Sequence, residues 1–183
     1  MGNPGREYEH TRHNLGADTV ALLASRHGDR LRMSKADRSL VSEVRIDGRR
    51  VALAFPQTYM NESGSAVGRL VRRHGIVDLA RLVVVHDELD LPVAKVRVKL
   101  GGGTAGHNGL RSIQAHLRDN GFARVRIGVG KPPGKQFGAD HVLRPPSKSE
   151  RTELEVAVQV AADAVESILV DGVPAAMNRF NGL

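Results

Sequence analysis

Apolar residues recur along this chain with helical spacing in several segments. The spacing predicts helices over Leu15–Arg26, from about residue 61 to residue 73, and after Asn108. The clearest helix begins at Ser149 and ends at Gly172, and its apolar positions are Leu154, Ala157, Val158, Ala161, Ala164, Val165, Ile168 and Leu169. We expect this helix to pack against the core.

Strand signals lie between the predicted helices. Residues 39–46 and 50–55 predict a β-hairpin, because Asp47-Gly48 is a favoured two-residue turn. Further strands are predicted over 82–86, 93–100 and 123–129, followed by a proline-bounded loop over 131–146. The pattern predicts an α/β fold: one domain over residues 1–183, with a mixed, twisted β-sheet flanked by helices.

Composition narrows the class of protein. A chain of 183 residues with 40% hydrophobic content can bury a core of ordinary size. The formal net charge of +7 favours an anionic partner, nucleic acid before membrane. The absence of cysteine excludes disulfides, thiolate metal sites and a cysteine nucleophile. No apolar stretch is long enough to span a membrane and no signal-peptide core is present, so a cytoplasmic location is expected.

Short polar segments with turn residues predict a polar pocket. Because a buried amide without partners costs about 1 to 3 kcal/mol, an interior does not use such side chains freely. The segments are 2–5, 12–14, 60–64, 86–90 and 106–109.

Two residues of these segments, His13 and Asp87, form a candidate catalytic pair. An imidazole held by a carboxylate serves as a general base, since its ordinary pKa near 6.5 suits proton abstraction from water at neutral pH. A lone histidine is more often a surface or core residue, and spacing alone leaves both interpretations open.

The glycine-rich segment 101–106 matches the dinucleotide-binding pattern G-x-G-x-x-G between a predicted strand and a predicted helix. No acidic residue ends a following strand about twenty positions on, as that function requires. The segment therefore favours a loop that needs positive φ and a close backbone approach.

Basic residues alternate on two predicted strands, which places them on one face of each strand. Two such faces side by side would suit phosphates, and an ordinary solvated sheet face is the alternative. The residues are Lys95, Arg97 and Lys99 on one strand and Arg124 and Arg126 on the other. Aromatic residues are too few for a base-stacking platform.

Taken together, the motifs resemble the bacterial peptidyl-tRNA hydrolase family over nearly the whole chain. Their shared order at compatible separations makes the resemblance specific. The matching segments are Gly-Asn-Pro-Gly at 2–5, Tyr8, Thr-Arg-His-Asn-Leu-Gly at 11–16, Tyr-Met-Asn-Glu-Ser-Gly at 59–64, His-Asp-Glu-Leu-Asp at 86–90, the glycine loop through Gly-His-Asn-Gly-Leu at 101–110, and Arg-Val-Arg-Ile-Gly at 124–128.

The resemblance implies hydrolysis of the ester that joins a peptide to the 3′-terminal ribose of tRNA. By the family's pattern His13 deprotonates the attacking water and Asp87 orients His13. Asn3 recognises the peptide side, and Asn61 and Asn108 fix the substrate and stabilise the developing oxyanion.

The same resemblance assigns the tRNA contacts. Tyr8 and Tyr59 match positions that contact the tRNA end, and Lys99 and Arg126 match basic positions that clamp phosphate. The scheme needs no metal and no cofactor, its partner is peptidyl-tRNA, and a monomer is expected.

The chain departs from the family pattern in two places. The apolar strand that usually precedes Gly-Asn-Pro-Gly is missing, and a late-called start of the sequence is one simple explanation. If the strand is truly absent, we expect the sheet to lose an interior strand and Asn3 to lie on a frayed terminus. Thr104-Ala105 replaces a segment that commonly carries a charged or histidine residue followed by glycine. A non-catalytic RNA-binding relative on the same scaffold is the competing interpretation.

Overall fold

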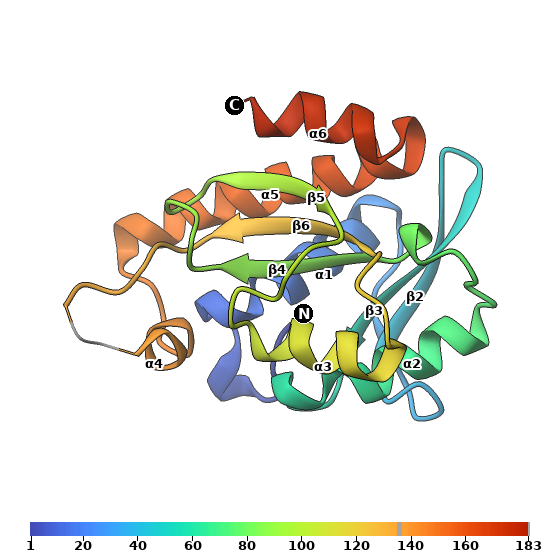
Figure 1. Ribbon diagram of the computed structural model, residues 1–183, viewed down its shortest axis with the longest axis horizontal. Helices are drawn as coiled ribbons and strands as arrows, with labels where there is room; N and C mark the ends of the chain where they lie inside the picture. The colour runs from blue at the N-terminus through green and yellow to red at the C-terminus, as the bar shows by residue number, and fades with distance from the viewer. Residues whose placement is uncertain (135–136, 183) are drawn as a thin grey trace.

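The strands form two three-stranded sheets in the computed structural model, which describes residues 1–134 and 137–182 (Figure 1). The first sheet is antiparallel, with the order β1 (Arg32–Ser34), β2 (Ser39–Ile46) and β3 (Arg49–Pro56). The second sheet is mixed, since β6 (Ala123–Gly128) lies between its parallel partner β4 (Val83–Glu88) and its antiparallel partner β5 (Val96–Leu100).

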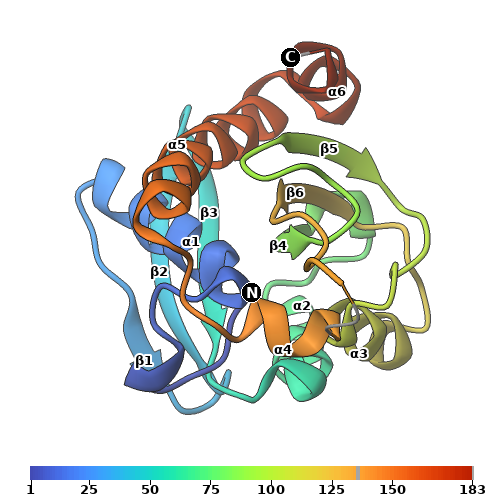
Figure 2. The ribbon, with the colours of Figure 1, turned by 90° about the vertical axis from the view of Figure 1, so that its left-hand side faces the viewer.

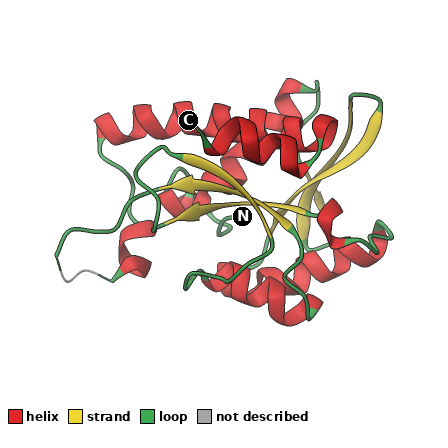
Figure 3. Ribbon diagram, turned by 45° about the horizontal axis from the view of Figure 1, so that its top comes forward, coloured by secondary structure: helices red, strands yellow, loops and turns green. Residues whose placement is uncertain are grey.

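Helices cover both sides of these strands (Figure 3). On one side lie α1 (Leu15–Arg26), α5 (Lys148–Asp171) and α6 (Val173–Asn181), and on the other α2 (Ser63–Arg73) and α3 (Asn108–Leu117). The shorter helical elements are α4 (Gly138–Val142) and the 3₁₀ turns η1 (Arg6–Tyr8), η2 (Arg12–Asn14), η3 (Met60–Glu62) and η4 (Leu79–Arg81). The α/β class with flanking helices is confirmed.

Two hydrophobic clusters fill the spaces between these layers. The larger cluster joins α1, α5 and α6 to the strands through residues such as Leu23, Val125 and Leu154. The smaller one joins α2 and α3 to β4 through residues such as Val84 and Ile113. The second sheet is therefore covered on both faces, which agrees with the near-continuous burial of β4.

The hairpin and the helix boundaries follow local sequence signals. Asp47 and Gly48 both have positive φ, at 50° and 73°, as the predicted two-residue turn requires. The helix α5 ends at Gly172, which has φ of 90°. The strand β5 begins later than the predicted residue 93 because Ala94 has φ of 64°, which an extended strand does not accommodate.

A cavity of about 980 Å³ separates the two sheets. Its walls include Val51 and Leu53 on β3, Val83 and Val85 on β4, and residues of α1, α2 and α5. Figure 2 shows β3 and β4 at the facing borders of the two sheets. Among the described residues, β3 pairs only with β2 and β4 only with β6, so each strand leaves one edge unpaired. The predicted single sheet is thus divided at an apolar gap between two open strand edges.

The prediction that Asn3 lies on a frayed terminus is wrong. The amino group of Met1 donates to Val85 O at 2.8 Å, and Met1 O accepts from Ala17 N at 3.0 Å. Met1 and Asn3 are both buried. Burial lowers the pKa of the Met1 amino group from 8.0 to about 5, against the opposing influence of Asp87 and Asp18. Backbone bonds to β4 and α1 therefore fix the residues that precede the first turn.

The contact between α2 and α3 depends on a glycine, which gives a test of the packing. A Cβ at Gly64 would lie 2.1 Å from Ser112 O, whereas a Cβ at Gly68 in the same helix would meet only Arg72 Nη1, at 3.6 Å. We expect Gly64→Ala to lower the free energy of unfolding by about 1 to 3 kcal/mol or more. Gly68→Ala, the matched control, should raise it by up to about 1 kcal/mol. Urea denaturation measures both, and equal effects would contradict this account of the packing.

Candidate active site

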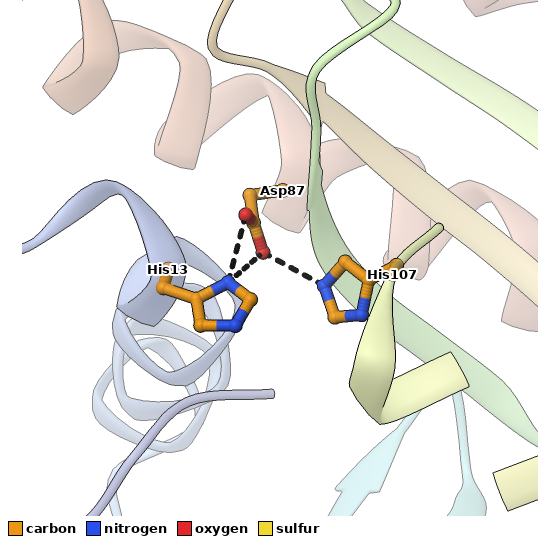
Figure 4. Close-up of side chains that lie close together, drawn as sticks. All are labelled: His13, Asp87 and His107. Atoms are coloured by element: carbon orange, nitrogen blue, oxygen red, sulfur yellow. Dashed lines mark hydrogen bonds and ion pairs between the residues drawn. The ribbon is translucent and has the colours of Figure 1, made fainter. Parts of the chain in front are cut away.

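His13 and Asp87 meet where η2 passes the end of β4. Asp87 lies one residue before the last position of β4, and His13 is the middle residue of η2, immediately before α1. His13 Nδ1 lies 2.9 Å from Asp87 Oδ1 and 2.8 Å from Asp87 Oδ2 (Figure 4). The carboxylate is 2% exposed and the imidazole 11% exposed. Two segments far apart in sequence thus form one short, shielded contact.

A second histidine, His107, binds the same carboxylate. His107 Nε2 lies 2.9 Å from Asp87 Oδ1, and Figure 4 shows both rings directed at Asp87. The other ring nitrogen, Nδ1, accepts from Gly109 N at 3.1 Å and Leu110 N at 3.3 Å and so caps α3. A backbone N–H can only donate, so Nδ1 carries no proton and Nε2 donates to Asp87.

The surroundings keep Asp87 ionised. Burial by itself raises the pKa of Asp87, but electrostatic interactions and hydrogen bonds with His107 and His13 outweigh burial. They hold the pKa of Asp87 well below its ordinary value. An ionised carboxylate accepts only, so His13 Nδ1 donates to it. Within residues 1–134 and 137–182, no side chain or backbone group bonds His13 Nε2, which is left to accept a proton.

Asn3 lies in a buried amide network beside this pair. Asn3 N donates to Asn14 Oδ1 and Asn14 Nδ2 donates to Asn3 O, both at 2.9 Å. Asn3 Oδ1 accepts from Met60 N at 2.7 Å. The side chain of Asn14, which follows His13 in η2, therefore connects the first residues of the chain to the turn that carries His13, and Asn3 connects them to η3.

Asn61 and Asn108 are exposed and belong to neighbouring elements. Asn61 lies in η3 and Asn108 begins α3, directly after His107. The two elements touch, since a Cβ at Gly109 would lie 2.6 Å from Met60 Sδ. No described residue bonds either amide side chain. Both amides are therefore available to a ligand on the side of α3 that carries His107.

The tyrosines differ in exposure. Tyr59 precedes η3 and is 58% exposed, while Tyr8 ends η1 and is half-buried. The structure places Tyr59 beside the element that carries Asn61. Tyr8 O accepts from Thr11 Oγ1 at 2.8 Å, which ties η1 to the segment before His13.

The predicted basic strand residues divide into two groups. Arg124 is buried, and its guanidinium donates to Gly103 O and, at 2.7 Å, to Gly102 O. Arg97 donates to Phe180 O at 3.0 Å. The side chains of Lys95, Lys99 and Arg126 make no hydrogen bond to a described residue. Arg124 and Arg97 are thus used by the fold, and Lys95, Lys99 and Arg126 are the members of this set left for a phosphate.

The glycine-rich loop has the backbone predicted for it. Gly101, Gly102 and Gly106 have φ of 66°, 99° and 77°. The carbonyls of the loop accept from Arg124, as described above. This is a structural reason for the glycines that needs no dinucleotide.

The sequence pattern did not single out His107 as a site residue. Its motif, Gly-His-Asn-Gly, is one of the polar segments, but the family resemblance assigns a role there to Asn108 alone. A histidine directly before a helix, where Nδ1 can act as the N-cap acceptor and Nε2 is left to donate, is the signal that would have found it. His86, which precedes Asp87, is fully buried and its ring lies edge-on to His107, with ring centroids 5.0 Å apart.

The ring nitrogens and carboxylate oxygens of His13, Asp87 and His107 lie within 4.8 Å of one another, a spacing at which three residues could bind one metal ion. The hydrogen bonds above already occupy the atoms that face each other. The two cap bonds to His107 Nδ1 also fix the orientation of that ring. The geometry is therefore accounted for by a hydrogen-bonded His-Asp-His group.

A histidine that donates to a buried carboxylate and keeps its second nitrogen free is an arrangement typical of hydrolases that activate water. The chain belongs to the peptidyl-tRNA hydrolase family, because the family model described as "Peptidyl-tRNA hydrolase" matches residues 1–183. The chain is 49% identical over 181 residues to the peptidyl-tRNA hydrolase of Rhodococcus erythropolis (strain PR4 / NBRC 100887), covering 99% of this chain and 95% of that protein.

Other relatives agree. The peptidyl-tRNA hydrolase of Cutibacterium acnes (strain DSM 16379 / KPA171202) is 48% identical over 191 residues, covering 99% of this chain and 95% of that protein. The crystal structure of peptidyl-tRNA hydrolase from Acinetobacter baumannii has a TM-score of 0.92 and 38% identity, covering 98% of this chain and 91% of that one. Among the helices of the described chain, none combines the length and apolarity needed to cross a bilayer.

Proposed function

We propose that the chain hydrolyses the ester between peptide and tRNA in peptidyl-tRNA and so releases tRNA for reuse in translation. Membership of the peptidyl-tRNA hydrolase family supports this activity. The observation that carries the mechanism is the His13–Asp87 contact at 2.8 Å with His13 Nε2 unbonded.

In this proposal His13 is the general base. Nε2 takes a proton from water as the water oxygen attacks the ester carbonyl carbon, and the Nδ1 proton stays bonded to Asp87. The ester carbon–oxygen bond then breaks, and the proton held on Nε2 passes to the 3′ oxygen of the ribose. The products are a peptide with a free carboxylate and tRNA with a free hydroxyl.

The amides around the pair supply the neutral donors. Asn61 and Asn108 stabilise the oxyanion of the tetrahedral intermediate and fix the substrate, a role that suits preorganised uncharged donors. Asn3 recognises the peptide side and helps to exclude aminoacyl-tRNA that carries no peptide. Its Oδ1 is held by Met60 N, so its Nδ2 is the group that faces a substrate carbonyl.

Single-turnover cleavage of a defined peptidyl-tRNA by this chain tests the proposed function. The same chain should leave an aminoacyl-tRNA with a free α-amino group largely intact. If the chain binds tRNA and cleaves no peptidyl-tRNA, the non-catalytic RNA-binding interpretation replaces this one.

The phosphate clamp has its own test. Because Lys99 and Arg126 are free of partners among the described residues, changing either to Ala should weaken tRNA binding. It should also flatten the salt dependence by about one unit of slope at most. Cleavage of a short ester substrate without tRNA should hardly change. Equal losses on both substrates would assign these residues to the fold or the chemistry instead.

The proposal includes a monomeric, cytoplasmic enzyme that consists of one domain over residues 1–183. Sedimentation of the purified chain across a range of concentrations tests the monomer, and a concentration-dependent mass would contradict it.

A further inference from the structure

The turn that carries His13 is held on both sides by its neighbours. Asn14, after His13, exchanges hydrogen bonds with the backbone of Asn3. Arg12, before His13, extends in the other direction toward the C-terminal part of the chain. The second anchor spans far more of the sequence than the first, and the proposed reaction does not use it.

Every described hydrogen bond of the Arg12 guanidinium goes to residues 141–150, which run from α4 into the first turn of α5. Nε donates to Glu150 Oε1 and Nη2 donates to Glu150 Oε2, both at 2.7 Å, which is a two-point ion pair. Nη1 donates to His141 O at 3.1 Å and to Arg144 O at 3.0 Å. Arg12 is 8% exposed and Glu150 is 19% exposed, so the pair is shielded from water.

Glu150 is held in place by the helix that bears it. It lies in the first turn of α5, where its backbone N donates to Ser147 Oγ, the N-cap. The helix α5 has 24 residues, packs against α1 and contributes to the larger hydrophobic cluster. A fixed carboxylate on this helix therefore defines where Arg12, and with it the backbone of η2, must lie.

We propose that Arg12 and Glu150 are positioning residues for His13, an inference that rests on the proposed function. The pair fixes the 3₁₀ turn so that the imidazole meets Asp87 with Nδ1 and keeps Nε2 directed at the substrate. Neither residue contacts the reacting atoms. A planar fork is required, because an ammonium group cannot bind both carboxylate oxygens and the two carbonyls in this arrangement.

Arg12→Lys tests the pair because it keeps the charge and removes the fork. We expect kcat for peptidyl-tRNA to fall by about tenfold to 100-fold, the effect of a displacement of about 1 Å in a catalytic group, with KM nearly unchanged. Glu150→Gln should also lower kcat and leave KM nearly unchanged. The double variant should be no slower than the slower single variant, since both changes break one interaction.

Arg26 provides the matched control. It also joins α1 to α5 through an ion pair, with Nη1 2.8 Å from Asp163 Oδ1 and 3.2 Å from Glu166 Oε2, and it lies at the far end of α1 from His13. Arg26→Lys should leave kcat unchanged. If Arg26→Lys lowers kcat as much as Arg12→Lys does, the effect is general loss of stability and the proposal fails.

A measurement without substrate separates this inference from the proposed function. Nuclear magnetic resonance of histidine labelled with ¹⁵N should show a hydrogen-bonded Nδ1 proton on His13 in the wild-type chain. The signal should broaden or move in Arg12→Lys and stay in place in Arg26→Lys. An unchanged His13 signal in Arg12→Lys overturns the positioning role, even if the chain cleaves peptidyl-tRNA as proposed. If the wild-type chain cleaves no substrate but the His13 signal changes in Arg12→Lys and not in Arg26→Lys, the proposed function fails and the positioning role stands.

Discussion

Replacing His13 with Ala should lower the single-turnover rate of peptidyl-tRNA cleavage by about 100-fold to 10,000-fold, the usual contribution of a general base. The substitution removes the only ring whose free nitrogen, Nε2, is proposed to take the proton from water. Binding of tRNA should be nearly unchanged, because the proposed phosphate contacts of Lys99 and Arg126 do not involve His13. Single-turnover rates and tRNA binding measured on the same variant give both values.

Asp87→Asn supplies the companion variant. It keeps the shape of the side chain and removes the charge that steadies the imidazolium formed on His13. An amide also accepts through its oxygen alone, so it cannot receive N–H donors from His13 and His107 as the carboxylate does. The rate should fall substantially, yet less than in His13→Ala.

The double variant decides whether the two residues act as a unit. His13→Ala combined with Asp87→Asn should be no slower than His13→Ala alone, since Asp87 acts through the imidazole. Additive losses, or near-normal turnover in His13→Ala, would remove the pair from the mechanism.

Local elements were predictable because their signals are local. The helix Leu15–Arg26 has the predicted bounds, and the Asp47-Gly48 turn sets the hairpin register. The helices α4 and α6 were not predicted, since α4 has five residues in a proline-bounded stretch and α6 begins directly after the glycine that ends α5. Short periodic segments give too few apolar repeats to distinguish a helix from a loop.

The sequence predicted which residues form most of the site, but only in part how they contact one another. The motifs named His13 and Asp87, whereas the role of His107 depends on which ring nitrogen caps α3, and a sequence does not contain that choice. The Arg12–Glu150 pair joins residues 138 positions apart, and no periodicity relates them. Contacts of this kind follow from tertiary packing, which brings α5 against α1.

The gap between the two sheets predicts a large gain in stability for a chain that fills it. Adding an apolar strand of five or six residues before Met1 should raise the melting temperature and the activity together. The cavity of about 980 Å³ lies between the unpaired edges of β3 and β4, and the Met1 nitrogen already donates to Val85 O on β4. Each buried Val, Leu or Ile contributes about 1.5 to 3 kcal/mol. Ordering each residue offsets roughly 1.5 kcal/mol of this.

The buried amino group adds a dependence on pH that the same extension should remove. The amine has a pKa of 8.0 in the unfolded chain and about 5 in the folded one, so the unfolded chain binds more protons between these values. Stability should therefore rise with pH from about 5 to 8, by about 4 kcal/mol at most, and stay flat below that range. A peptide N–H in place of the amine keeps the bond to Val85 O and carries no charge.

A polar extension of the same length, built from Gly and Ser, separates the two contributions. It removes the charged amine, so it should abolish the rise in stability between about pH 5 and 8, but it should not fill the apolar cavity. Only the apolar extension should also raise the free energy of unfolding above about pH 9, where the amine is largely uncharged in the unfolded chain too. Activity should follow this second gain, because a strand paired with β4 stabilises the strand that carries Asp87. Thermal unfolding and cleavage rates of the three chains measure these effects. If the apolar extension is neither more stable nor more active than the unextended chain, the cavity between β3 and β4 does not accept a strand.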